Sequence, residues 1–143
     1  MARPRRKDTI HRSFRLASPL VEHLARRADQ AGTSVSALVE RYLDEGIRID
    51  EHPLIYFREG AAGRRPAVMG TRLDVWQVIE TIRQNDNAIA DAAEYLSLPQ
   101  PHVEACVNYY LAYQDEIDEW TAREREAAEK AETSWRRRQA IFA

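Results

Sequence analysis

The sequence has little cysteine, scattered histidines and no long apolar run. Its single cysteine, Cys106, cannot form a disulfide within the chain. The four histidines are His11, His23, His52 and His102. Their spacing is not that of a zinc site, so we expect no metal and no cofactor. No stretch approaches the roughly 18 apolar residues of a membrane helix, and the basic N-terminus lacks the apolar segment of a secretory signal. We therefore expect a cytoplasmic protein.

The sequence also lacks a recognisable catalytic set. No Ser/His/Asp or Cys/His arrangement and no phosphate-binding loop appears at a usable spacing. The chain has 143 residues, of which 44% are hydrophobic and 31% charged. That length suits one compact domain or two very small ones. We therefore expect a binding module, not an enzyme.

Charge is distributed unevenly, although the net charge is only -2. From Met1 to Arg48, ten Arg and Lys residues stand against six Asp and Glu, a balance of +4. From Leu73 to Trp120, one Arg stands against ten Asp and Glu, a balance of -9. The first part suits a polyanion such as nucleic acid, whereas phosphate would repel the second.

Residues 9–16, TIHRSFRL, alternate in polarity as a half-buried strand does. One side is apolar apart from Arg12 and carries Ile10, Phe14 and Leu16. The other side carries Thr9, His11, Ser13 and Arg15. No second strand follows nearby, and a buried strand cannot leave its backbone unpaired. We therefore predict an antiparallel two-stranded ribbon, formed with the same strand of a second copy.

Two short helices are predicted after the strand. The first has Ser18 as its expected N-cap, Pro19 at its first position and Gly32 as its stop. The second has Ser34 as its expected N-cap and should end near Gly46. Its expected buried residues are Val35, Leu38, Val39, Tyr42 and Leu43. One strand and two short helices cannot enclose a core alone, which again favours a homodimer.

Residues 8–47 resemble ribbon-helix-helix DNA-binding domains of the MetJ/Arc/CopG type. The resemblance implies that outward strand residues read base edges in the major groove. Here these residues are His11, Ser13 and Arg15. It also implies that the start of the second helix contacts phosphate, which maps onto Thr33, Ser34 and Val35. Arg12 stands where the family is usually apolar, and we expect its long stem to reach a phosphate at the ribbon's edge.

The segment ahead of the strand is basic. It carries Arg3, Arg5, Arg6 and Lys7. Such a terminus is often a solvated, disordered end. Next to a DNA-reading ribbon we favour contact with the DNA backbone or the minor groove.

The middle of the chain is predicted to form a hairpin and three helices. LIYF and residues 66–69 are the expected strands, joined by a loop with Gly60 and Gly63. The first helix is expected after Asp74 as N-cap, with Val75, Trp76, Val78, Ile79 and Ile82 inside. The next two helices are expected over residues 87–96 and 99–120. The last should bury Val103, Cys106, Val107, Tyr110, Leu111 and Ile117.

The run GRRPAVMGTRLDVW resembles the hallmark of the family catalogued as domain of unknown function 433. The matching residues are Gly63, Pro66, Gly70, Thr71 and Arg72. That family is typically found as the VapB-like antitoxin partner of PIN-like ribonuclease toxins. Residues 88–113 look like a helix-turn-helix, but the acidic balance argues against a second DNA site. We expect a dimerising or partner-binding module.

The Gly70-Thr71-Arg72 turn has two interpretations. Arg72 can bind a phosphate or a carboxylate of a partner. Alternatively, Gly70 permits the turn, Thr71 ties the loop and Arg72 pairs with a local acid such as Asp74. We favour the second.

The C-terminal tail, residues 121–143, is predicted to be helical with few residues to bury. It ends in apolar and basic side chains, namely Trp135, Arg136, Arg137, Arg138, Ile141 and Phe142. Apolar anchors on a charged segment suit a partner's groove. The antitoxin resemblance implies that one of the three arginines enters the acidic site of a PIN nuclease. The alternative is that the tail completes the last helix or frays.

These observations predict a mainly α fold with short β structure in three parts. Residues 1–48 form a ribbon-helix-helix domain, residues 49–120 a helical partner-binding module, and residues 121–143 a toxin-binding tail. The expected function is that of a type II antitoxin that represses its own operon as a dimer and neutralises a PIN-like ribonuclease. The alternative is a transcriptional regulator whose C-terminal module oligomerises or senses a ligand, with no toxin partner.

Overall fold

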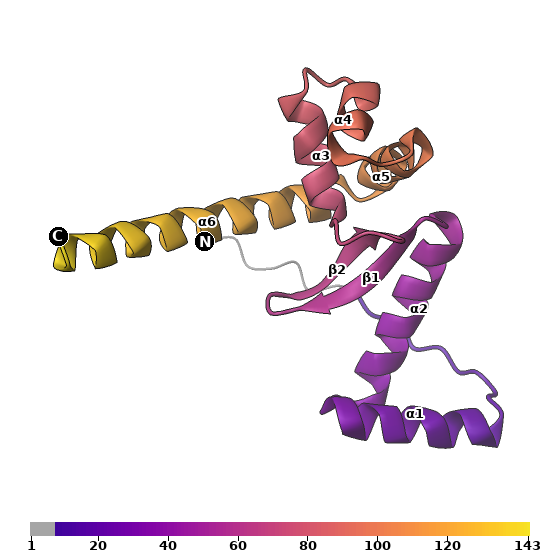
Figure 1. The fold of residues 1–143 in the computed structure, drawn as a ribbon. Coiled ribbons are helices and arrows are strands. Elements are labelled where there is room, and N and C mark those ends of the chain that lie inside the picture. Colours follow the sequence, from indigo (N-terminus) through magenta and orange to yellow (C-terminus); the bar gives the residue numbers. More distant parts are fainter. Residues whose placement is uncertain (1–7) are drawn as a thin grey trace. The chain divides into compact units, whose positions relative to one another are not determined.

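The computed structural model describes residues 8–143. It divides the chain into two compact units, the first ending at Leu43 and the second spanning Asp44–Ala143. The described elements in chain order (Figure 1) are α1 Ser18–Ala31, α2 Val35–Glu51, β1 Ile55–Gly60, β2 Gly63–Val68, α3 Val75–Gln84, α4 Ile89–Leu96, α5 Gln100–Ala112 and α6 Gln114–Ile141. The prediction of a mainly helical fold with a little β structure is confirmed. None of these helices combines the length and apolar content that crossing a membrane requires.

The first unit contains α1 and the first turns of α2. Ala17, in extended conformation, is the N-cap of α1, so Ser18 is the first helical residue and not the cap. The prediction was wrong by one residue because Pro19 is tolerated at the second helical position as well as the first. Gly32 ends α1 with a left-handed φ of 64°, as predicted. Ser34 caps α2 as predicted, because its hydroxyl accepts the backbone N–H of Ala37 at 3.1 Å.

Helix α2 does not end near Gly46 but continues to Glu51. Two charged residues, one on each side of the glycine, explain the difference, because both are tied to other elements of the second unit. Glu45 pairs with Arg64 of β2, and Arg48 pairs with Glu116 of α6. A glycine inside a helix costs only about 1 kcal/mol, which such tertiary contacts can offset. The unit boundary after Leu43 therefore lies inside a continuous helix, earlier than the boundary expected after residue 48.

Residues 8–17 form no strand with any other described segment of the chain. The predicted ribbon-helix-helix arrangement is therefore not confirmed. A strand whose only partner is a second copy has no backbone ladder within one chain, so the intermolecular ribbon stays a prediction. The first unit buries little by itself. Of the helix residues expected inside, Leu38 is buried, whereas Val35, Tyr42 and Leu43 are exposed.

The predicted hairpin lies in the second unit and is confirmed, although β1 continues to Gly60 and β2 starts at Gly63, so the loop is shorter than expected. Strands β1 and β2 pair antiparallel from Ile55 opposite Val68 to Gly60 opposite Gly63. Gly63 adopts a φ of 115°, which L side chains rarely accept, and so permits the tight connection. The hairpin supplies Ile55 and Val68 to the core.

The core of this unit lies between the hairpin and α3, α4, α5 and the first turns of α6. Its buried members are Ile55, Val68, Val75, Val78, Ile79, Ile82, Ala92, Ala93, Val103, Cys106, Tyr109 and Ile117. The helix predicted over 99–120 is in fact two helices, because Tyr113 leaves helical geometry with φ −132° and ψ 46°. Within α5 the buried residues are Val103, Cys106 and Tyr109, whereas Leu111, expected inside, is 73% exposed.

Helix α6 leaves the core along its length. Ile117, Trp120 and Thr121 are buried, and Glu124 and Arg125 still pair with β2 and α3. From Glu126 onward every residue is exposed. With 28 residues the helix is about 42 Å long, and Figure 1 shows its far half extending away from α3, α4 and α5. The segment that lies outside the core therefore starts after Arg125, within the tail predicted over 121–143.

Candidate DNA interface and protein-binding tail

The three residues predicted to read bases are all exposed. The structure brings two of them together, since the hydroxyl of Ser13 lies 3.3 Å from Nε2 of His11. This contact fits the predicted alternation, in which residues two apart point to the same side. Arg15 has no hydrogen bond or ion pair with the rest of the described chain. Within residues 8–143, Arg12 donates only to the neighbouring carbonyl of His11, at 3.3 Å.

The apolar side of the same segment is uncovered. Ile10 is 74% and Phe14 75% exposed. Both line an open hollow of about 580 Å³ together with Val35, Val39 and Leu43 of α2. Large apolar side chains gathered at one open surface mark a site that another molecule covers. This segment therefore combines a polar edge with an apolar surface that is left unfilled.

The start of α2 offers backbone donors to an anion. The first helical N–H groups, beginning at Val35, have no carbonyl partner in the preceding turn. The N–H of Thr33 is different, because it donates to the carbonyl of Ala28 at 3.0 Å. Of the three predicted phosphate contacts, Ser34 acts as the cap and Val35 opens the helix, while Thr33 retains only its hydroxyl for this role.

The remaining predicted DNA contacts, Arg3, Arg5, Arg6 and Lys7, lie outside the described residues.

The turn at residues 70–72 ties the hairpin to α3. Gly70 has a left-handed φ of 76°. The hydroxyl of Thr71 donates to the carbonyl of Val68 at 2.9 Å and accepts the N–H of Leu73 at 3.0 Å. The predicted roles of Gly70 and Thr71 are confirmed. The expected pairing of Arg72 with Asp74 is wrong. Arg72 is exposed and has no polar partner among the described residues.

Asp74 is instead occupied by two arginines of the hairpin. Arg58 and Arg65 stand opposite each other in the strand register, where like charges repel. The buried carboxylate of Asp74 approaches Arg58 Nη2 at 2.6 Å and Arg65 Nε at 3.0 Å, and it also accepts Trp76 Nε1 at 3.2 Å. It therefore neutralises a like-charge pair that would otherwise open the hairpin. Residue spacing does not predict this cluster.

Arg48 forms a second cluster that the sequence did not reveal. Its Nη1 donates to the hydroxyl of Tyr109 at 2.8 Å and to Glu116, and its guanidinium lies 4.0 Å from the ring centre of Tyr113. Burial opposes the charge of Arg48, but the bonds to Glu116 and Tyr109 outweigh it and raise the arginine pKa. Burial, with the nearby Glu116 carboxylate, raises the pKa of Tyr109. This cluster fixes the last turn of α2 to the junction of α5 and α6.

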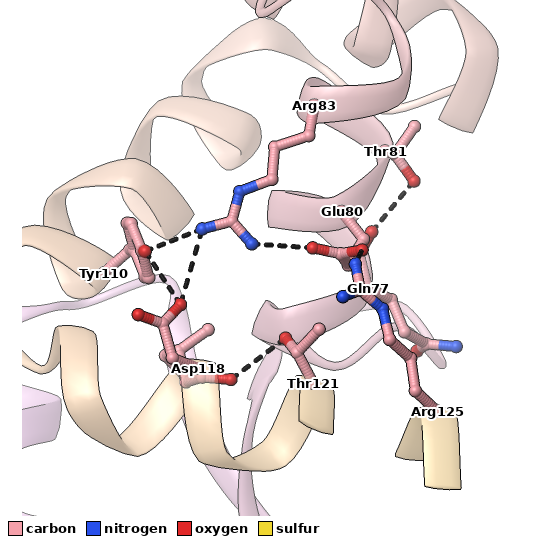
Figure 2. A network of polar contacts seen from close by, with 9 residues as sticks. Gln77, Glu80, Thr81, Arg83, Tyr110, Asp118, Thr121 and Arg125 are labelled. Atoms are coloured by element: carbon pink, nitrogen blue, oxygen red, sulfur yellow. Dashed lines mark hydrogen bonds and ion pairs between the residues drawn. The ribbon is translucent and has the colours of Figure 1, made fainter. Parts of the chain in front are cut away.

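A third cluster joins α3, α5 and α6 (Figure 2). Glu80 accepts Nη1 of Arg83 at 2.7 Å and also binds Arg125. Arg83 reaches the hydroxyl of Tyr110 at 2.7 Å, and that hydroxyl donates to Asp118 at 2.8 Å. Burial raises the pKa of Glu80, but the two arginines outweigh burial and hold it below the ordinary value. Through Arg125, this cluster anchors α6 at the point where it leaves the core.

The predicted tail residues all lie on the exposed part of α6 or directly after it. Trp135 is 57% and Phe142 88% exposed, and Ile141 is exposed as well. Arg136 is paired with Glu132 one turn earlier, at 2.6 Å. Arg137 and Arg138 have no polar partner among the described residues. Trp135, Arg138 and Phe142 are spaced three and four apart, so they share one helix face.

Comparison with known proteins does not extend these observations. No protein-family model matches the chain, and neither the curated proteins nor the solved structures contain a significant match.

Proposed function

We propose that this protein is a homodimeric, DNA-binding antitoxin that represses its own operon through residues 1–48 and neutralises a PIN-like ribonuclease through its C-terminal tail. The observation that carries the DNA-binding part is the two-sided character of residues 9–16. Exposed apolar side chains at Ile10 and Phe14 alternate with exposed polar ones at His11, Ser13 and Arg15. A second copy that covers the apolar side would leave a polar ribbon of the width that enters a major groove.

The charge and the backbone geometry support the same proposal. The first 48 residues carry a balance of +4, which favours a polyanion. The capped start of α2 provides N–H groups of the kind that bind phosphate in such complexes. In the proposal Arg15 binds guanine and His11 and Ser13 make single base contacts. Arg12, Thr33, Ser34, Val35 and the basic segment before the strand contact the backbone.

The toxin-binding part is supported by the exposed part of α6. This part places Trp135, Ile141 and Phe142 in water, together with three arginines and no acid after Glu132. Apolar anchors with a cation between them suit a groove that offers apolar pockets and carboxylates. A nuclease with an acidic site has that chemistry.

The test is co-expression with any small PIN-like nuclease that is encoded beside this chain's gene. We expect the full chain to restore growth and to co-purify with the nuclease. A chain truncated after Arg125 keeps all core contacts of α6 and should lose both effects. The variant Glu94→Ala, an exposed change on α4 outside the tail, serves as the control and should retain them. Growth rescue by the truncated chain, or no such neighbouring nuclease, would contradict the toxin pairing.

The alternative is a regulator whose second unit only oligomerises or senses a ligand. It is favoured by the core of that unit, because its residues, including the fully buried Tyr109 and Cys106, all come from one chain. In that case truncation after Arg125 would leave DNA binding and repression unchanged, and no nuclease would co-purify.

A further inference from the structure

The exposed segment of α6, residues 126–142, has two unlike halves. The first half is acidic, with three glutamates against Lys130, and its other side chains are mostly small. It carries Glu126, Glu129, Glu132, Ala127, Ala128 and Ala131. The second half is basic and bulky. It carries Arg136, Arg137, Arg138, Trp135, Ile141 and Phe142. Each half therefore holds the charge and the side-chain size that the other half lacks.

A segment of this kind is complementary to itself when it runs antiparallel. A two-fold interface brings residue i of one copy against residue j of the other, and j against i. Antiparallel pairing lays the basic half of one copy along the part of the other copy that carries Glu129 and Glu132, twice. Parallel pairing would place arginine against arginine and glutamate against glutamate. Charge alone therefore favours the antiparallel arrangement.

We propose that the exposed segments of α6 from two copies pair antiparallel, with their two-fold axis at Trp135. The face used consists of residues spaced three, four and seven apart, namely Ala128, Ala131, Trp135 and Phe142. About this axis Phe142 of one copy covers Ala128 of the other, so a large side chain meets a small one at each end. Arg138 of one copy lies beside Glu132 of the other.

The structure also sets where the pairing begins. The same face of α6 is occupied nearer its start, where Ile117, Trp120 and Thr121 are buried. A second helix can therefore approach this face only beyond Arg125, which is the last residue anchored to the core, through Glu80. Ion pairs between residues four apart also stabilise the helical conformation of this segment in the single chain. Glu126 bonds Lys130 at 2.7 Å, and Glu132 bonds Arg136 at 2.6 Å.

This pairing goes beyond the proposed function and does not depend on it. It occupies the face that the proposed function gives to the nuclease, so the paired form and the nuclease-bound form would exclude each other. Self-pairing would then keep Trp135 and Phe142 covered while no nuclease is present.

The experiment uses the full chain with two cysteines, Ala131→Cys and Gln139→Cys, which face each other across the proposed axis. The native Cys106 is buried, so we expect it to form no disulfide in this experiment. A disulfide needs Cα atoms roughly 4.4–6.8 Å apart, so mild oxidation should link two copies only if the faces meet. The control pair is Thr133→Cys with Gln139→Cys, because Thr133 points to the opposite side of the helix. Equal linking of both pairs would overturn the proposal.

Charge reversal tests the orientation. In the cysteine-bearing chain, changing Arg136, Arg137 and Arg138 to Glu should lower the linked fraction about tenfold. Reversing the first half as well, with Glu126, Glu129 and Glu132 changed to Arg and Lys130 to Glu, should restore it. Circular dichroism of each variant reports whether α6 remains helical. Linking that is unchanged by the first reversal, or not restored by the second in a helical chain, would overturn the proposal. Nuclease binding, measured separately, tests the proposed function and should not return in the doubly reversed chain.

Discussion

Arg48 in the last turn of α2 and Tyr109 in α5 are joined by a hydrogen bond of 2.8 Å across 61 residues of sequence. The tyrosine hydroxyl also donates a hydrogen bond to Glu116 in the first turn of α6, at 2.8 Å. Three helices thus meet at one guanidinium and one hydroxyl. This contact explains why α5 stops at Ala112, since Glu116 and Ile117 can return to the core only if the chain turns at Tyr113.

Replacing Arg48 with alanine should lower the free energy of unfolding by about 3 kcal/mol, because Glu116 and Tyr109 lose a shared charged donor in a partly buried site. The matched control is Tyr109→Phe, which removes one hydroxyl and keeps the ring, and should cost about 1 kcal/mol. Urea denaturation followed by circular dichroism measures both. A loss no larger for Arg48→Ala than for Tyr109→Phe would contradict the central role of the guanidinium.

Asp74→Asn should destabilise the second unit by about 3 kcal/mol, because two facing arginines would lose the carboxylate between them. Arg72→Ala, two residues away, should change the unfolding free energy by less than about 0.5 kcal/mol, because Arg72 is exposed and has no polar partner among the described residues. Comparing these two variants distinguishes the two interpretations of the Gly70-Thr71-Arg72 turn. A large loss for Arg72→Ala would show that its side chain is structural.

The Glu80 cluster should make stability fall in acid. The pKa of Glu80 is held below its ordinary value of 4.5, so its charged form stabilises the folded state above that pH. The contribution should be lost as the pH falls from about 4.5 through the lower folded-state value. Glu80→Gln should therefore lower the melting temperature at pH 7 and narrow its difference from the parent chain as the pH approaches 3. A difference that stays constant over that range would contradict the assignment.

Cys106 should be unreactive in the folded protein. Burial raises the pKa of its thiol to about 12, so very little thiolate exists at pH 8. Labelling with a thiol reagent should be slow in buffer and rapid in denaturant, with one equivalent incorporated. Rapid labelling under native conditions would show that the core around α5 opens readily.

Local signals predicted much of this fold. The capping serine at position 34, the left-handed Gly32 and the N-cap at Asp74 act within a few residues, so their sequence patterns are sufficient. The hairpin was predicted for the same reason, since two apolar runs flank a glycine-containing loop. Thr71 also acts locally, by bonding the backbone on both sides of the turn.

The features that were missed depend on contacts between distant residues. Gly46 looks like a helix stop, but Glu45 and Arg48 hold α2 against partners at positions 64 and 116. Helical spacing favours Tyr110 and Leu111 as buried residues, but Tyr109 is buried instead, where its hydroxyl meets Arg48 and Glu116. Arg72 is only two residues from Asp74 in the sequence, which favours a local pair, but Arg58 and Arg65 reach the carboxylate through the hairpin. The exposed Ile10 and Phe14 are the opposite case, since their predicted partner is another chain.

The most direct measurement of the DNA-binding claim is the affinity of the full chain for its own promoter and for a shuffled duplex at one salt concentration. We expect the promoter to be preferred, and Arg15→Ala to reduce that preference by about 1–3 kcal/mol. Deleting residues 1–7 should instead weaken both duplexes alike and flatten the salt dependence. Equal binding of the parent chain to both duplexes, or an equal loss on both for Arg15→Ala, would contradict the account.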